Sequence, residues 1–65
     1  MTLQEFYTIC ERVEKQETVY LERDDGLKAK VLGTLRGAQS YWVEIWGSGK
    51  LEAWHHQEVK GETKV

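Results

Sequence analysis

Residues 41–56 constrain the fold of this chain most strongly, because they read as a β-hairpin that contains all three tryptophans and both histidines. In the first half of the stretch, Tyr, Val and Ile alternate with Trp and Glu, which is the two-residue period of a strand. A turn, Gly47-Ser48-Gly49, follows, and the alternation then resumes. The pattern predicts two antiparallel strands joined by this turn.

The length of the turn decides which side chains share a face of the hairpin. A two-residue turn places Val43 opposite Trp54, whereas a three-residue turn places Trp42 opposite Trp54. The three-residue turn gathers the aliphatic side chains on one face and places Gly49 where a left-handed residue is needed, so we expect this register. It predicts that Trp42, Trp46 and Trp54 lie together on the opposite face.

Length and composition limit the chain to one small domain. The 65 residues carry a formal net charge of −2, whereas nonspecific nucleic-acid binders usually carry a basic excess. The single Cys10 excludes an internal disulfide and fits a reducing compartment. The sequence shows no signal peptide and no apolar run long enough to cross a membrane. We therefore expect a cytoplasmic protein without a membrane partner.

The rest of the chain predicts one helix and further strands in simple order. Thr2 and Glu5 have the spacing of a capping box, and apolar residues then recur at helical intervals. The expected elements are a helix at residues 2–16 and strands at about 17–23, 27–35, 41–46 and 50–56. Gly33 marks an expected bend or bulge in the second strand. We assign residues 1–59 to the domain and expect residues 60–65 to form a frayed tail.

Asp24-Asp25-Gly26 is expected to join the first two strands. A three-residue turn pairs Leu21 with Ala29 and Tyr20 with Lys30, which gives both strands a consistent apolar face. The two aspartates could also be interpreted as a metal or acid–base pair. No further ligands follow in a calcium-loop pattern, so we interpret them as turn residues.

These elements predict an α+β fold in which an N-terminal helix is followed by a four- to five-stranded antiparallel meander. The bent second strand and the tight turns favour a small barrel over an open sheet. The strand rhythm of residues 19–59 resembles that of SH3-like domains, including the Tudor and KOW types. The resemblance rests on strand spacing alone, so it implies a small SH3-like barrel and transfers no functional residue.

No catalytic or metal-binding set stands out in the sequence. His55 and His56 are adjacent, and adjacent side chains of a strand point to opposite faces, so they do not readily chelate one ion. Cys10 lies within the apolar stripe of the helix and is interpreted as a small buried hydrophobe rather than a reactive thiol. We predict no catalytic residues, no metal and no cofactor, and therefore not an enzyme.

The face opposite the aliphatic one remains as the candidate functional surface. It is predicted to include Tyr20, Trp42, Trp46, Trp54 and His56. This is more apolar surface than a monomer normally leaves exposed, so one explanation is that the helix or the curl of the sheet covers it. A second explanation is a protein-binding face, including self-association into a homodimer.

A third explanation is a platform for single-stranded nucleic acid, in which the tryptophans stack on bases. The phosphate contacts would come from Lys28, Lys30, Arg36 and Lys50. Glutamates on the same face oppose this interpretation. We predict a small non-enzymatic protein-binding domain, of a size that fits a phage or mobile-element accessory or inhibitor protein, with single-stranded nucleic-acid binding as the alternative.

Overall fold

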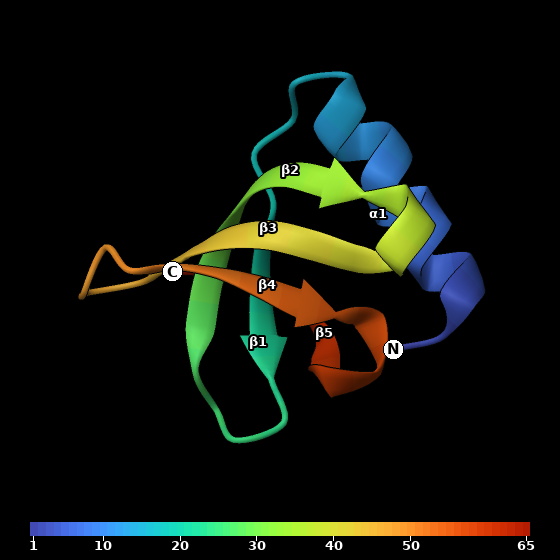
Figure 1. The fold of residues 1–65 in the computed structure, drawn as a ribbon. Helices are drawn as coiled ribbons and strands as arrows, with labels where there is room; N and C mark the ends of the chain where they lie inside the picture. The colour runs from blue at the N-terminus through green and yellow to red at the C-terminus, as the bar shows by residue number, and fades with distance from the viewer.

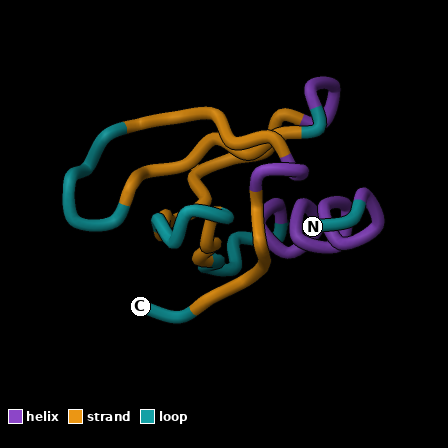
Figure 2. The backbone as a smooth tube through the Cα atoms, turned by 90° about the horizontal axis from the view of Figure 1, so that it is seen from below, coloured by secondary structure: helices purple, strands orange, loops and turns teal.

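The computed structural model describes residues 1–65 and shows one helix followed by five antiparallel strands (Figure 1). The elements are α1 (Leu3–Glu14), β1 (Tyr20–Arg23), β2 (Lys28–Leu35), the 3-10 turn η1 (Arg36–Ala38), β3 (Ser40–Ile45), β4 (Leu51–His55), the 3-10 turn η2 (His56–Glu58) and β5 (Val59–Thr63). Seen from below, α1 lies to one side of the strands (Figure 2). The predicted α+β class is confirmed.

The helix begins as the capping box predicts. The Glu5 amide donates to Thr2 Oγ1 at 3.1 Å, and the Thr2 amide donates to Glu5 Oε1 at 2.9 Å. Thr2 is thus the N-cap, and the helix ends at Glu14, slightly before the predicted residue 16. It ends early because Gln16 takes a left-handed conformation with φ of 71°, which the helix does not tolerate.

The strands form one sheet with the order β4-β3-β2-β1-β5. The predicted pairing of β1 with β2 is confirmed, with Leu21 opposite Ala29 and Tyr20 opposite Lys30. The expected irregularity at Gly33 is also confirmed, because the register between β2 and β3 shifts between Val31 and Gly33. This bulge bends β2, and Figure 1 shows the resulting curvature.

The prediction that residues 60–65 form a frayed tail is wrong for most of that segment. Residues through Thr63 belong to β5, which pairs with β1 from Arg23 opposite Val59 to Tyr20 opposite Thr63. Arg12 of α1 adds a bidentate ion pair with Glu62, at 2.8 and 3.0 Å. The segment has no apolar alternation, so the local sequence does not indicate a strand. Its strand conformation depends on these long-range contacts.

The sheet is open and strongly curled. In a flat sheet its edges β4 and β5 would lie four strand spacings, roughly 19 Å, apart. Only η2 connects them, and the four Cα–Cα steps from His55 to Val59 span at most about 15 Å. The sheet must therefore curl to bring its edges together. No ladder joins β4 to β5, so the predicted closure into a barrel is not confirmed.

The register predicted for the tryptophan hairpin is wrong. The Ile45 amide donates to the Lys50 carbonyl oxygen, so four residues, 46–49, lie between the last hydrogen-bonded positions of the hairpin, rather than three. Tyr41 therefore lies opposite Trp54 and Glu44 opposite Leu51. Gly49 does take the expected left-handed conformation, with φ of 72°. Because side chains alternate between faces, the one-residue shift turns every side chain of β4 to the other side of the sheet.

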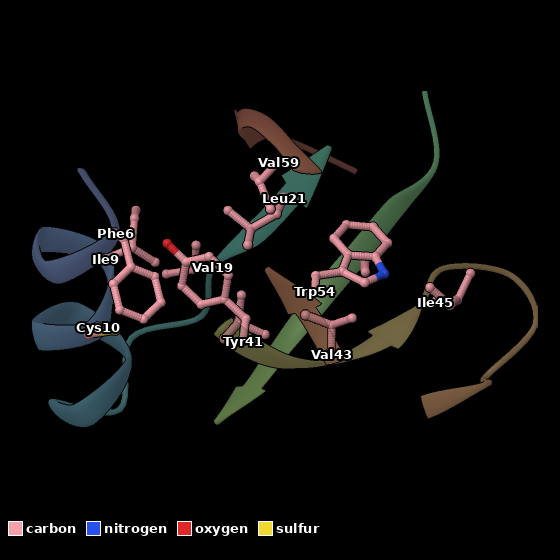
Figure 3. Close-up of a cluster of buried hydrophobic side chains, with 12 residues drawn as sticks. Phe6, Ile9, Cys10, Val19, Leu21, Tyr41, Val43, Ile45, Trp54 and Val59 are labelled. Atoms are coloured by element: carbon pink, nitrogen blue, oxygen red, sulfur yellow. The ribbon is translucent and has the colours of Figure 1, made fainter. Parts of the chain in front are cut away.

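The curled sheet and α1 enclose one apolar core (Figure 3). Its members are Phe6, Ile9, Cys10, Val19, Leu21, Ala29, Val31, Tyr41, Val43, Ile45, Trp54 and Val59. The rings of Phe6 and Tyr41 pack with their centroids 4.9 Å apart where α1 meets the sheet. The concave face of the sheet is thus filled, and the convex face is left for other contacts.

Candidate protein-binding face

The convex side of the sheet carries a group of large apolar side chains that we call the outer aromatic face. It consists of Tyr20 of β1, Leu32 of β2, Trp42 of β3, Trp46 in the following turn and Leu51 of β4. The exposed fractions are 56% for Trp46, 53% for Leu51, 45% for Leu32 and 38% for Trp42. Four neighbouring strands therefore present apolar surface to solvent on the same side.

Trp46 is held in place at one end of this face. Its amide donates to the carbonyl oxygen of Lys28 at 2.8 Å, which extends the ladder between β2 and β3 beyond Ile45. Its ring meets the ring of Tyr20 edge-on, with centroids 5.7 Å apart and planes at 87°. This T-shaped contact is a favoured aromatic geometry and stabilises the observed orientation of the indole.

The turn after β3 leaves a shallow groove beside Trp46. The groove has a volume of about 280 Å³ and is lined by Lys30, Glu44, Ile45, Trp46, Gly47 and Gly49. Lys30 and Glu44 lie directly opposite each other on β2 and β3. The groove therefore places one positive and one negative side chain next to an exposed indole, as at an interface with a polar rim.

Trp42 and its neighbours form the other end of the outer aromatic face. Trp42 lies opposite Ala53 of β4, which is exposed and too small to cover the indole. Leu32 sits in the β2 bulge, immediately before the Gly33 that pairs with Trp42. The exposure of Trp42 thus follows from a small neighbour on one side and an interrupted ladder on the other.

Trp54 does not belong to this face, contrary to the prediction. It is only 1% exposed and lies on the concave side, where Figure 3 shows it beside Val43. Its Nε1 donates to Glu52 Oε1 at 2.9 Å, and the guanidinium of Arg23 lies 5.1 Å from the ring centroid. Arg23 also pairs with Glu52 at 3.3 Å. These polar groups cover the indole, so Trp54 is a core residue.

His56 is also absent from the outer aromatic face, contrary to the prediction. The chain leaves β4 at His55, and His56 is the first residue of η2, where it is buried. Its Nδ1 lies 3.0 Å from the Met1 carbonyl oxygen, and its ring centroid is 5.9 Å from that of Phe6. His56 therefore packs against the N-terminal segment and is closed to a partner.

The residues predicted to contact phosphates are only partly brought together. Lys28 and Lys30 lie on β2 beside the outer aromatic face, and Lys50 is exposed at the end of its turn. Arg36 lies in η1 and pairs with Glu14 of α1, at 2.8 and 3.0 Å. This contact lowers the pKa of Glu14 below its ordinary value. Arg36 is thus engaged with the helix and separate from the lysines.

The charged groups divide into two classes. All three arginines form ion pairs, namely Arg12 with Glu17 and Glu62, Arg23 with Asp25 and Glu52, and Arg36 with Glu14. None of the lysines forms one. The arginines therefore tie elements of the fold together, and the lysine ammonium groups are free for external contacts.

Leu51 is the residue of the outer aromatic face that sequence reasoning missed, because the expected register assigned it to the aliphatic side. In β4 either alternate set contains one large apolar residue, Leu51 in one and Trp54 in the other. The pattern of β4 alone therefore does not indicate which set is buried. The two glycines of the turn, Gly47 and Gly49, were the available signal for a longer turn, and both take a positive φ in the structure, 91° and 72°.

The other side chains that could take part in catalysis or metal binding are dispersed or buried. Cys10 is fully buried, and burial raises the pKa of its thiol. No group of three or more His, Cys, Asp or Glu side chains has an arrangement that could hold a metal ion. Neither α1 nor the short 3-10 turns are long and apolar enough to cross a membrane. No protein-family profile, curated protein or solved structure matches this chain.

Proposed function

We propose that this domain is a non-enzymatic protein-binding module that uses the outer aromatic face. One observation carries the proposal: four large apolar side chains on one side of a small sheet are between 38% and 56% exposed. Tryptophan and tyrosine are enriched among the residues that dominate binding energy at interfaces. An exposed apolar face of this composition is typical of a site that a partner covers.

The arrangement of the face supports binding with little loss of side-chain entropy. Trp42 is anchored on a central strand, and the edge-on contact with Tyr20 stabilises the observed orientation of Trp46 before any partner arrives. Preorganised aromatic side chains lose few rotamers on association, so more of the contact energy appears as affinity. Lys30 and Glu44, which lie opposite each other on β2 and β3, supply polar groups that restrict the orientation of a partner.

Site-specific photo-cross-linking in cells of the source organism tests this proposal. A benzoylphenylalanine at position 46 keeps an aromatic ring on the outer aromatic face, and the same residue at the exposed Lys15 position is the matched control. We expect a discrete adduct with another protein from position 46 that is absent from position 15. The adduct should disappear when Trp42→Ser is added in a variant with unchanged circular dichroism. Identical adducts from both positions, or none from position 46, would contradict the proposal.

Single-stranded nucleic-acid binding is the second candidate function, and the free lysines favour it. Lys28 and Lys30 adjoin Tyr20 and Trp46 without internal ion pairs, so a strand that stacks on these rings would find ammonium groups beside it. Quenching of tryptophan emission by a mixed-sequence oligonucleotide, weakening as salt increases, would favour this candidate. An unchanged spectrum at low salt would reject it and leave the protein partner.

We further propose a fold type, a cellular location and a biological role for this domain. The three-residue link between the two sheet edges supports a small SH3-like barrel as the description of the curl. The lone buried Cys10 supports a reducing, cytoplasmic location. The small size and the absence of convergent acid–base groups support an accessory or inhibitor protein, such as those of phages and mobile elements, that acts on a larger machine.

A further inference from the structure

The edge strand β4 presents backbone hydrogen-bonding groups that the domain itself does not use. The Ile45 amide donates to the Lys50 carbonyl oxygen at 2.7 Å, and the His56 amide donates to the Gln39 carbonyl oxygen at 3.0 Å. Backbone groups of an antiparallel strand alternate in direction, so even-numbered residues of β4 face β3. The amides and carbonyls of Leu51 and Ala53 therefore point away from the sheet.

The two edges of the sheet differ in how they are protected. Strand β5 contains a glycine and two charged residues, its Glu62 is bound by Arg12, and its ladder to β1 shifts register between Glu22 and Arg23. Charges, bulges and glycines are the features that discourage pairing with another strand. Strand β4 has neither lysine nor proline, and its five pairs with β3 are regular. Its one charged side chain, Glu52, is engaged by Arg23 and Trp54.

We propose that β4 pairs antiparallel with β4 of a second copy of this chain, about a two-fold axis that passes between the two Ala53 residues. The Ala53 amide and carbonyl of each copy would exchange two hydrogen bonds across the axis. On either side, the Leu51 amide of one copy would donate to the His55 carbonyl of the other. The His55 amide is already satisfied by Glu58 Oε2 at 3.1 Å and is not needed.

The register at Ala53 is the self-complementary one. It uses all five residues of β4 and places Leu51 opposite His55 and Glu52 opposite Trp54, so no like charges face each other. A register centred on Glu52 would place this carboxylate opposite its own copy, which is unfavourable. The small Ala53 at the axis leaves space on the convex side for Trp42, its partner on β3, to lean over the new contact.

The paired strands would unite the two curled sheets. Both outer aromatic faces would then lie on the same side of the joined sheet, with Leu51 and Trp42 of each copy on either side of the axis. The pairing uses the backbone of β4 and needs no other partner, so it goes beyond the proposed function. It can be tested independently of that function.

Sedimentation of the purified full chain over a range of concentrations tests the pairing. We expect a reversible equilibrium between the 7.6 kDa chain and twice that mass. Ala53→Pro removes an amide that the ladder to β3 does not use, so it should abolish the dimer and leave the monomer folded. Ala53→Lys keeps the amide but places two like charges at the axis, and it should weaken dimerisation on the order of tenfold or more.

Thr63→Lys is the matched control, because it adds the same charge to the opposite edge strand β5 and should leave the dimer unchanged. Circular dichroism verifies that each variant is folded. If the proline variant does not fold, the effect of Ala53→Lys on dimerisation tests the proposal alone. A chain that stays monomeric at all concentrations would overturn the proposal. So would a dimer that is insensitive to Ala53→Lys, or an assembly larger than a dimer, which would indicate pairing of β4 with β5. None of these results depends on the cross-linked partner of position 46.

Discussion

Replacing Trp54 by alanine tests the position of β4 in the fold, because the two registers of the hairpin give opposite results. In the structure Trp54 is 1% exposed, its indole donates to Glu52, and Arg23 covers the ring. In the three-residue-turn register the same side chain would lie on the convex face, beside Trp42. The natural comparison is Trp46→Ala, which removes the same side chain from a position that is 56% exposed.

The expected cost of Trp54→Ala is large relative to the stability of the domain. Burial of a tryptophan side chain removes about 150–250 Å² of surface from contact with water. Truncation of such a side chain to alanine in a core lowers the free energy of unfolding by about 3–5 kcal/mol. A 65-residue domain has a free energy of unfolding of roughly 3–10 kcal/mol. We therefore expect Trp54→Ala to remove about a third of this free energy at the least and most of it at the centre of both ranges. Trp46→Ala loses partial burial and the contact with Tyr20, which together are worth about 1–2 kcal/mol, well below the cost of Trp54→Ala.

Urea denaturation followed by far-ultraviolet circular dichroism measures both values. The m-values of wild type and Trp46→Ala should agree, which would show that the compactness of the two states is unchanged. A double variant with Trp42→Phe and Trp46→Phe leaves Trp54 as the only tryptophan. Its emission, excited selectively at the red edge of the absorption band, should be blue-shifted until the domain unfolds. If Trp54→Ala costs no more than Trp46→Ala, the assignment of Trp54 to the core is refuted.

Three further predictions address local features. Gly49→Val should lower the free energy of unfolding by about 1–2 kcal/mol, because position 49 has a φ of 72° that a β-branched residue rarely adopts; an unchanged urea midpoint would contradict this. Hydrogen bonds from Arg23 lower the pKa of Asp25 from 3.8 to about 2, so its stabilising contribution is present above the ordinary pKa and is lost as the pH falls through about 2. The difference in unfolding midpoint between wild type and Asp25→Asn should therefore shrink over that interval, and a constant difference would count against the ion pair. Burial raises the pKa of Cys10, so a thiol reagent should label it only at the rate of opening or unfolding; immediate labelling of the native protein would show that Cys10 is accessible.

The elements that could be predicted from the sequence are those specified by neighbours along the chain. The capping box of Thr2 and Glu5 sets the start of α1 through two hydrogen bonds within one turn. The hairpin of β1 and β2 follows from Asp-Gly turn chemistry, and its pairing of Leu21 with Ala29 is the one that the turn length implies. The bend at Gly33 likewise needs only the missing side chain of one residue.

The strand β5 and the position of His56 required the tertiary structure. Nothing local favours a strand at residues 60–63, and the segment is ordered because the free edge of β1 and Arg12 of α1 satisfy its backbone and its charge. His56 is buried because the chain must cross from β4 to β5 over the end of the core, next to Phe6. Both outcomes depend on residues about 40 to 55 positions away in sequence.

By itself, the sequence determined that this chain has a capped helix, an antiparallel meander and more aromatic surface than its core can hold. The tertiary structure decided which aromatics are buried. In β4 the set of Leu51 with Ala53 and the set of Glu52 with Trp54 each contain one large apolar residue, so strand periodicity does not choose between them. The core has a space at its end that the indole of Trp54 fills. On the same face Glu52 accepts hydrogen bonds from Arg23 and from Trp54, so this set is the buried one. The aromatic members of the outer aromatic face, Tyr20, Trp42 and Trp46, are among those that the core does not bury.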